Sequence, residues 1–169
     1  STIETAQQIA SKVARKAAVR VATLDVTDSD IRNYREDFVN PVINSSDSRD
    51  MSRRFPEELV QEKVNRLSAK LQAYQTPLFV VHLDYASDRL NEAYQAGLLR
   101  LSEASGGHAW LCRSRVQIPE ALQAAFNAIR TVHRLELQRS PRVPEQGQLE
   151  IRNGGRVLRY RAQYEWKGD

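Results

Sequence analysis

Apolar residues recur along this chain with two different spacings, and the change from one spacing to the other predicts its elements. The segment 1–17 predicts a helix, because Ser1 and Glu4 fit a capping box and the apolar residues that follow have helical spacing. Residues 18–25 are rich in β-forming side chains and predict a first strand. Residues 26–54 are irregular and rich in serine and aspartate, which predicts mostly surface loop.

Further helices and strands are expected to alternate after this loop. Pro56 is placed to open a helix, and the nearly continuous apolar run Leu78–Leu83 is typical of a parallel strand covered on both faces. A helix is expected from about residue 87 to residue 105. It ends at Gly106-Gly107, where a left-handed cap needs a residue without Cβ, and Ala109–Cys112 is then expected to form the third strand.

The period changes after a fourth helix, which Pro119 opens. Residues 133–138 and 158–164 alternate between apolar and polar, which is typical of antiparallel strands with one solvated face. The chain is therefore predicted to be an α/β protein whose mostly parallel sheet is flanked by helices. Residues 1–169 are expected to form one domain, in which residues 131–169 add antiparallel strands at the sheet edge or a small appended sheet.

Composition adds few constraints. The chain has 169 residues, 41% of them hydrophobic, and a net charge of +4, so it is long enough to bury a core and is mildly basic. Its single cysteine, Cys112, excludes an internal disulfide and a Cys-rich zinc site, and its apolar neighbours favour a buried, unreactive thiol. No apolar run approaches the length of about 18 residues that a membrane span needs.

No arrangement of residues typical of catalysis stands out. The chain holds neither a Gly-x-Ser-x-Gly nucleophile elbow nor a phosphate-binding Gly-x-x-x-x-Gly-Lys loop. Gly106-Gly107 follows the carboxyl end of a helix, which is the wrong end of the helix dipole for a phosphate. His82 lies in a run expected to be a buried strand, which favours a core histidine over a catalytic base. A non-enzymatic role is therefore expected.

Four features that follow one another in a fixed order resemble a known family. They are a strand LFVVHL, a helix that leads into LLRLSEASGGHAW, a helix and edge strand IPEALQAAFNAIRTVHRLEL, and closing strands that end in RYRAQY. This order resembles the C-terminal half of a von Willebrand factor type A domain, and it is closest to the bacterial variety of that family. The resemblance covers residues 77–166 well and residues 1–76 loosely.

The resemblance implies a three-layer sandwich with a site for a divalent metal, Mg²⁺ foremost, at the carboxyl ends of the strands. It also implies a non-catalytic protein-binding or adhesion-type module, in which the metal holds an acidic group of a protein partner, since a hard cation prefers oxygen ligands. The family's metal motif is Asp-x-Ser-x-Ser. Asp25, Thr27 and Ser29 match it, with Thr in place of the first Ser, and Asp84 is a further candidate ligand.

Other interpretations of these acidic residues stay open. The strand 18–25 also fits the family's fourth strand, in which case the first, metal-binding strand lies outside this chain. Asp25 and Asp84 both follow predicted strands, where they either share the crevice in which open α/β sheets bind ligands or cap the helices that come next.

A second hypothesis for function rests on the basic carboxyl-terminal segment. Arg156, Arg159 and Arg161 lie in the predicted closing hairpin together with Tyr160 and Tyr164. Arginines and aromatic rings on a β-ribbon are suited to bind a nucleic-acid backbone and to stack on bases. The alternation also places the tyrosines opposite Arg159 and Arg161, which is typical of a half-buried strand. The sequence therefore predicts a protein-binding module, with a nucleic-acid-binding module as the alternative.

Overall fold

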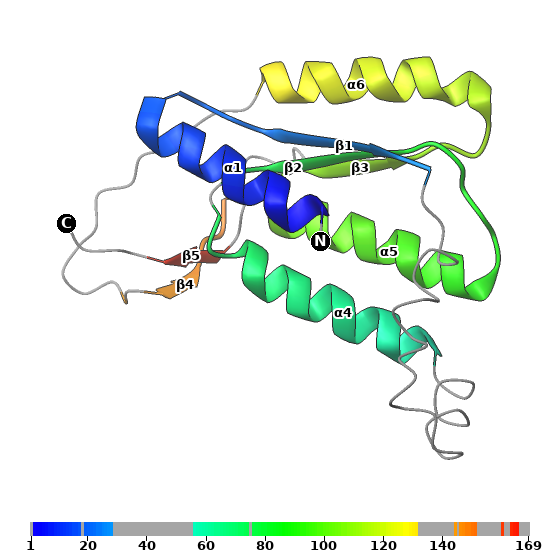
Figure 1. Cartoon of the computed structure of the whole chain (residues 1–169), viewed down its shortest axis with the longest axis horizontal. Helices are drawn as coiled ribbons and strands as arrows, with labels where there is room; N and C mark the ends of the chain where they lie inside the picture. Colours follow the sequence, from blue (N-terminus) through cyan, green and yellow to red (C-terminus); the bar gives the residue numbers. More distant parts are fainter. Residues whose placement is uncertain are drawn as a thin grey trace.

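The computed structural model describes residues 2–17, 19–28, 56–74, 76–131, 144, 146–151, 160 and 163–165. These residues form a general α/β fold, in which a small three-stranded parallel sheet is flanked by helices (Figure 1). The elements are, in chain order, α1 (Thr2–Ala17), β1 (Thr23–Thr27), α4 (Pro56–Leu71), β2 (Leu78–His82), α5 (Arg89–Ala104), β3 (His108–Leu111), the short 3-10 helix η3 (Arg115–Gln117), α6 (Ile118–Arg130), β4 (Gln146–Gln148) and β5 (Gln163–Glu165).

β2 is the central strand of the parallel sheet. The strand order is β1-β2-β3, with Thr23 beside Leu78 and Phe79 beside His108. All residues of β2 are buried, which confirms the prediction of a parallel strand covered on both faces. The connecting helices α4 and α5 lie on one side of the sheet together with α1, whereas α6 lies on the other side (Figure 1).

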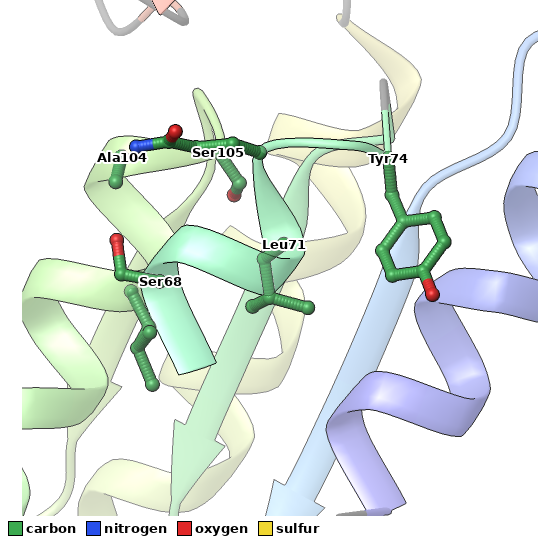
Figure 2. A pocket seen from close by; sticks show the side chains of 7 residues that line it. Ser68, Leu71, Tyr74, Ala104 and Ser105 are labelled. Carbon is green, nitrogen blue, oxygen red and sulfur yellow. The ribbon is translucent and has the colours of Figure 1, made fainter. Parts of the chain in front are cut away.

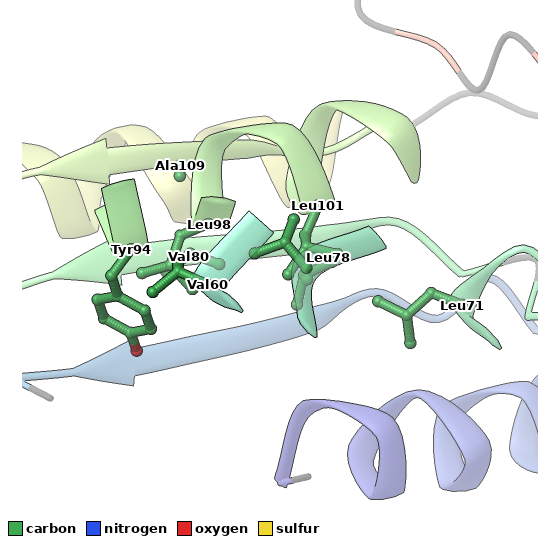
Figure 3. Packing of buried hydrophobic residues seen from close by; sticks show 9 residues of the cluster. Val60, Leu71, Leu78, Val80, Tyr94, Leu98, Leu101 and Ala109 are labelled. Atoms are coloured by element: carbon green, nitrogen blue, oxygen red, sulfur yellow. The ribbon is translucent and has the colours of Figure 1, made fainter. Parts of the chain in front are cut away.

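Two apolar clusters hold the helices against the two faces of the sheet. Figure 3 shows the larger cluster, in which side chains of β2 and β3 meet those of α4 and α5. Burying one such side chain fully stabilises the fold by about 1.5–3 kcal/mol, so these clusters are the main source of stability for the sheet. The buried members of the larger cluster are Val60, Val64, Leu71, Leu78, Val80, Tyr94, Leu98, Leu101 and Ala109. Those of the cluster on the α6 face are Val81, Cys112, Ala121 and Ala125.

α5 ends in a Schellman motif, as the double glycine predicts. Gly106 has a φ of 85° and its N–H donates to the carbonyl of Glu103 (3.0 Å), while the N–H of Gly107 donates to the carbonyl of Ser102 (2.8 Å). Gly107 meets a second constraint, because a Cβ at this position would lie 1.8 Å from the carbonyl oxygen of Leu78. One glycine therefore allows the left-handed turn, and the other allows the chain to pass close to β2.

Ser105 links this helix end to the start of β2. Its Oγ accepts a hydrogen bond from the backbone N–H of Leu78 (2.8 Å) and donates to the carbonyl of Ser102 (2.7 Å). Leu78 is fully buried, so this bond satisfies a backbone donor that would be costly to leave without a partner.

The predicted helices are confirmed, but the first strand is displaced. β1 covers Thr23–Thr27 rather than 18–25, because its ladder begins where the N–H of Thr23 donates to the carbonyl of Pro77 (2.9 Å). Asp25 consequently lies within β1 and not after it. None of the described helices has the length and hydropathy needed to cross a membrane.

β4 and β5 form a small sheet of their own. They pair antiparallel, with Gly147 beside Tyr164, and within the described residues this sheet is separate from the parallel one. Whether residues 131–169 form only an appended sheet or also add strands at the edge of the parallel sheet stays a prediction. The strand expected over 133–138 and most of the segment 158–164 lie outside the described residues.

Candidate functional site

The carboxyl ends of the parallel strands bring several connecting segments to one edge of the sheet. Asp28 follows β1, residues 83–88 follow β2, and residues 112–114 follow β3. Open α/β sheets commonly bind their ligands at this edge, because the strands fix the bases of the loops while the loops themselves can vary.

Backbone hydrogen bonds extend the sheet into the segment 83–88. The N–H of Leu83 donates to the carbonyl of Thr27 (2.8 Å), and the N–H of Tyr85 donates to the carbonyl of Cys112 (2.9 Å). The start of this segment is therefore bonded to the neighbouring strands on both sides.

Side chains of α5 fix the rest of the segment. Gln95 is 1% exposed, and its amide both accepts from the N–H of Ala86 (3.0 Å) and donates to the carbonyl of Ala86 (2.8 Å). Asp88 caps α5, since its carboxylate accepts from the backbone N–H of Asn91 (3.2 Å) and from the side-chain amide of Asn91 (2.6 Å). Both ends of the segment are therefore held by the fold.

Charged groups are exposed at this fixed segment, beside the half-buried ring of Tyr85. Asp84 is exposed, and the guanidinium of Arg113 lies 4.7 Å from the ring centroid of Tyr85, which is a cation–π contact. The Tyr85 hydroxyl also donates a long hydrogen bond to Glu92 (3.5 Å). We call Asp84, Tyr85 and Arg113 the carboxyl-end surface.

The side chains at this edge with the most catalytic potential are buried behind that surface. His82 is 1% exposed, and its ring meets the ring of Tyr94 edge-on at 6.2 Å. Cys112 is 2% exposed, and burial raises the pKa of its thiol, which disfavours the nucleophilic thiolate. The interpretations of His82 as a core histidine and of Cys112 as a buried thiol are confirmed.

The candidate metal ligands are only partly brought together. Asp25 and Thr27 lie on one face of β1, because strand residues two apart point the same way. Asp25 pairs with Val80, which precedes Asp84 by four positions, so Asp84 lies up to about 13 Å further along the chain direction at ~3.3 Å per extended residue. Ser29 lies outside the described residues.

Asp25 is partly withdrawn from water. It is half-buried, and this burial raises the pKa of its carboxyl. In the described part of the chain, no three His, Cys, Asp or Glu side chains are grouped so as to hold a metal ion. Asp25 and Thr27 alone do not make a Mg²⁺ site, so the metal site stays a prediction.

The basic residues of the nucleic-acid hypothesis lie outside the described residues, namely Arg156, Arg159 and Arg161. Their neighbour Tyr160 is half-buried, and its hydroxyl accepts a hydrogen bond from the backbone N–H of Ile151 (3.2 Å). This contact fits the alternation of a half-buried strand, and the nucleic-acid hypothesis stays a prediction.

A small depression lies at the opposite, amino end of β2. Figure 2 shows it between the carboxyl ends of α4 and α5, where Leu71, Tyr74 and Ser105 are among the residues that line it. It encloses about 10 Å³, which is room for about one water molecule and not for a metabolite. The remaining lining residues are Ser68, Gln72, Leu101 and Ala104.

Comparisons of this chain with models of protein families, with curated proteins and with solved structures gave no match. Sequence reasoning missed the role of Gln95. The signal was present, because Gln95 stands three residues before Leu98 on the buried side of α5, where an apolar residue is expected. A glutamine at a core position indicates a buried hydrogen-bonding partner, although not which loop supplies it.

Proposed function

We propose that this chain is a non-catalytic protein-binding module that recognises its partner through the carboxyl-end surface. The observation that carries the proposal is the fixed segment 83–88, which presents exposed groups from a backbone bonded on both sides. A loop that the fold already holds loses little conformational entropy on binding, so more of the contact energy is left as affinity.

The chemistry of the surface suits a protein partner. Tyr and Arg are enriched among the residues that dominate binding energy at protein interfaces, and here Tyr85 and Arg113 stack on one another. Asp84 adds a negative charge beside them. A partner that fits would offer a carboxylate to Arg113, a basic side chain to Asp84 and an apolar contact to the Tyr85 ring.

The arrangement of elements supports the same proposal. The parallel sheet has α5 on one side and α6 on the other, an arrangement compatible with the three-layer sandwich that the type A-like resemblance implies (Figure 1). The burial of His82 and Cys112 supports a non-catalytic role, because neither side chain is accessible to a substrate. The surface that remains at this edge is one for recognition.

A photo-crosslinking experiment tests the proposal. A photoreactive residue is placed at position 84 and, in a matched control, at the exposed position 72 near the opposite end of the sheet, and each variant is irradiated in extract of the cells that make this chain. We expect one discrete protein adduct at position 84 and none at position 72. Arg113→Ala or Tyr85→Ala should lower the yield by about fivefold or more, as truncation of an energetically important contact does.

Two outcomes would contradict the proposal. One is an equal pattern of adducts from positions 84 and 72, which would show only non-specific contact. The other is a specific adduct at position 84 whose yield is unchanged by both Arg113→Ala and Tyr85→Ala, which would place the binding contacts elsewhere.

A further inference from the structure

The outer edge of β1 carries backbone groups that point away from the sheet. The N–H of Thr23 and the carbonyl of Thr27 are bonded towards β2, through Pro77 and Leu83. Because successive residues of a strand direct their hydrogen-bonding groups to opposite sides, those of Leu24 and Val26 point outward. Within the described residues β1 is an edge strand, and an open edge is a template for pairing with another strand.

Apolar side chains are exposed on both faces beside this edge. On the α6 face, Val26 is 47% exposed, although its neighbour Leu24 packs against the α6 cluster. On the other face, α1 exposes Ile9 (58%) and Val13 (44%). Val13 comes nine residues after Glu4, about two and a half helical turns, so it lies on the side of α1 opposite to the Glu4 contact with α4.

That contact fixes which way the apolar side of α1 faces. Glu4 forms an ion pair with Lys70 of α4 (3.2 Å), and Gln7 of α1 is buried against the sheet side, where Thr76 donates to it. The opposite side of α1, with Ile9 and Val13, therefore faces away from α4. Within the described residues β1 therefore has no strand on its outer side, and apolar side chains are exposed on both faces beside it.

The charged residues along this edge are complementary to those of a second copy of the edge that runs in the opposite direction. Arg20 and Asp28 are both exposed, one before the start of β1 and the other after its end. If a second copy of the strand runs antiparallel with Leu24 opposite Leu24, then Arg20 lies opposite Asp28 and Val26 lies opposite Ala22. Leu24 and Val26 have outward-pointing backbone groups, and the same alternation continued beyond both ends of β1 would turn those of Arg20, Ala22 and Asp28 outward as well, so that each pair could exchange both hydrogen bonds.

A shift of register loses these pairings. With Leu24 opposite Val26 instead, Asp25 would face Asp25 of the other copy, and like charges directly opposite one another are destabilising. With Val26 opposite Val26, the position opposite Arg20 would lie beyond Asp28, so Arg20 would not meet the Asp28 carboxylate. Charge complementarity therefore selects the register centred on Leu24.

We propose that two copies of this chain associate through antiparallel pairing of their β1 edges, centred on Leu24. The pairing joins the two parallel sheets into one sheet with a two-fold axis at its centre. The axis sets the two α1 helices side by side on one face, where their Ile9 and Val13 side chains meet. The Val26 side chains are covered on the other face.

Sedimentation equilibrium over a concentration series, up to about 0.1 mM, tests the proposal. We expect the wild-type chain to form a dimer. Arg20→Asp or Asp28→Arg should each raise the dissociation constant of the dimer by about tenfold or more, because the two-fold axis makes two such pairs and each variant places like charges opposite one another in both. The double variant Arg20→Asp with Asp28→Arg restores opposite charges in both pairs, so it should dimerise like the wild type.

A backbone variant gives an independent test. Val26→Pro removes an outward N–H and leaves the ladder to β2 intact, so we expect a folded monomer, with a circular dichroism spectrum like that of the wild type. Val26→Thr keeps the N–H and is the matched control, which should remain dimeric. A monomeric wild type, a double variant as weak as the single ones, or a dimer that survives Val26→Pro would each overturn the proposal.

Discussion

Gly107→Ala tests whether the junction between α5 and β3 is as closely packed as its geometry indicates. An added Cβ would lie 1.8 Å from the carbonyl oxygen and 2.5 Å from the carbonyl carbon of Leu78. Ordinary contacts begin near 3.4 Å, so the two strands must separate by about 1.6 Å at this point. Leu78 is fully buried in the central strand, and a backbone atom cannot rotate away as a side chain can.

The cost follows from what this separation disrupts. Overpacking a core costs about 1–3 kcal/mol even where side chains can adjust. The shift also strains the bond from Ser105 Oγ to the Leu78 N–H (2.8 Å) and the bond from the Gly107 N–H to Ser102 (2.8 Å), each worth about 1 kcal/mol. We expect Gly107→Ala to lower the free energy of unfolding by about 3–5 kcal/mol, a large part of the 5–15 kcal/mol of a typical domain.

Two other glycines provide matched controls. Gly106→Ala places a Cβ on a residue with a φ of 85°, which should cost only about 1–2 kcal/mol. In Gly97→Ala the new Cβ would lie 2.5 Å from a methyl group of Val64, so Val64→Ala in the same chain should relieve the clash. No side-chain change should rescue Gly107→Ala, because its clash is with backbone.

Urea unfolding followed by circular dichroism measures all of these variants under the same conditions. The expected order of destabilisation is Gly107→Ala well above Gly106→Ala. A Gly107→Ala variant that is destabilised by less than Gly106→Ala would refute the reasoning, because it would mean that the chain can move away from Leu78 at little cost.

Three further expectations rest on single side chains. Ser105→Ala leaves the buried N–H of Leu78 without its acceptor, so we expect a loss of about 1–3 kcal/mol in urea unfolding, and a loss below 0.5 kcal/mol would contradict this. Gln95→Leu removes both hydrogen bonds to Ala86, so amide hydrogen exchange in residues 83–88 should become faster while exchange in α6 stays as before. Unchanged exchange in residues 83–88 would contradict the role of Gln95 in holding this segment. Burial raises the pKa of Asp25, so the free energy of unfolding should fall as the pH rises from the usual carboxyl pKa of about 4 through the raised pKa. Asp25→Asn should therefore have a higher melting temperature than the wild type at neutral pH, and this gain should vanish in acid. A gain that is the same at all pH values would contradict this expectation.

The pattern of apolar residues was sufficient to predict the parallel sheet and its helices. The apolar run Leu78–Leu83 could be assigned to a central strand, because a strand covered on both faces buries such a short run. The Gly106-Gly107 pair located the end of α5, since a left-handed cap is a local property of the backbone. Both signals lie within a few neighbouring residues.

What depends on distant partners was not predictable. The start of β1 is set by the carbonyl of Pro77, which lies far along the chain, so the strand was expected too early and Asp25 was expected after it. The contact between Arg113 and Tyr85 joins two loops whose proximity follows only from the strand order. How far the candidate ligands Asp25 and Asp84 lie from one another likewise depends on the register of β1 against β2, which follows only from the fold.

Amide hydrogen exchange of this chain, with and without the protein captured at position 84, tests the proposed binding surface most directly. We expect the partner to add protection in residues 83–88 and at Arg113, with little change at β4 and β5, because only the carboxyl-end surface is covered. Added protection confined to α1 or to the small antiparallel sheet, with residues 83–88 unchanged, would contradict the account.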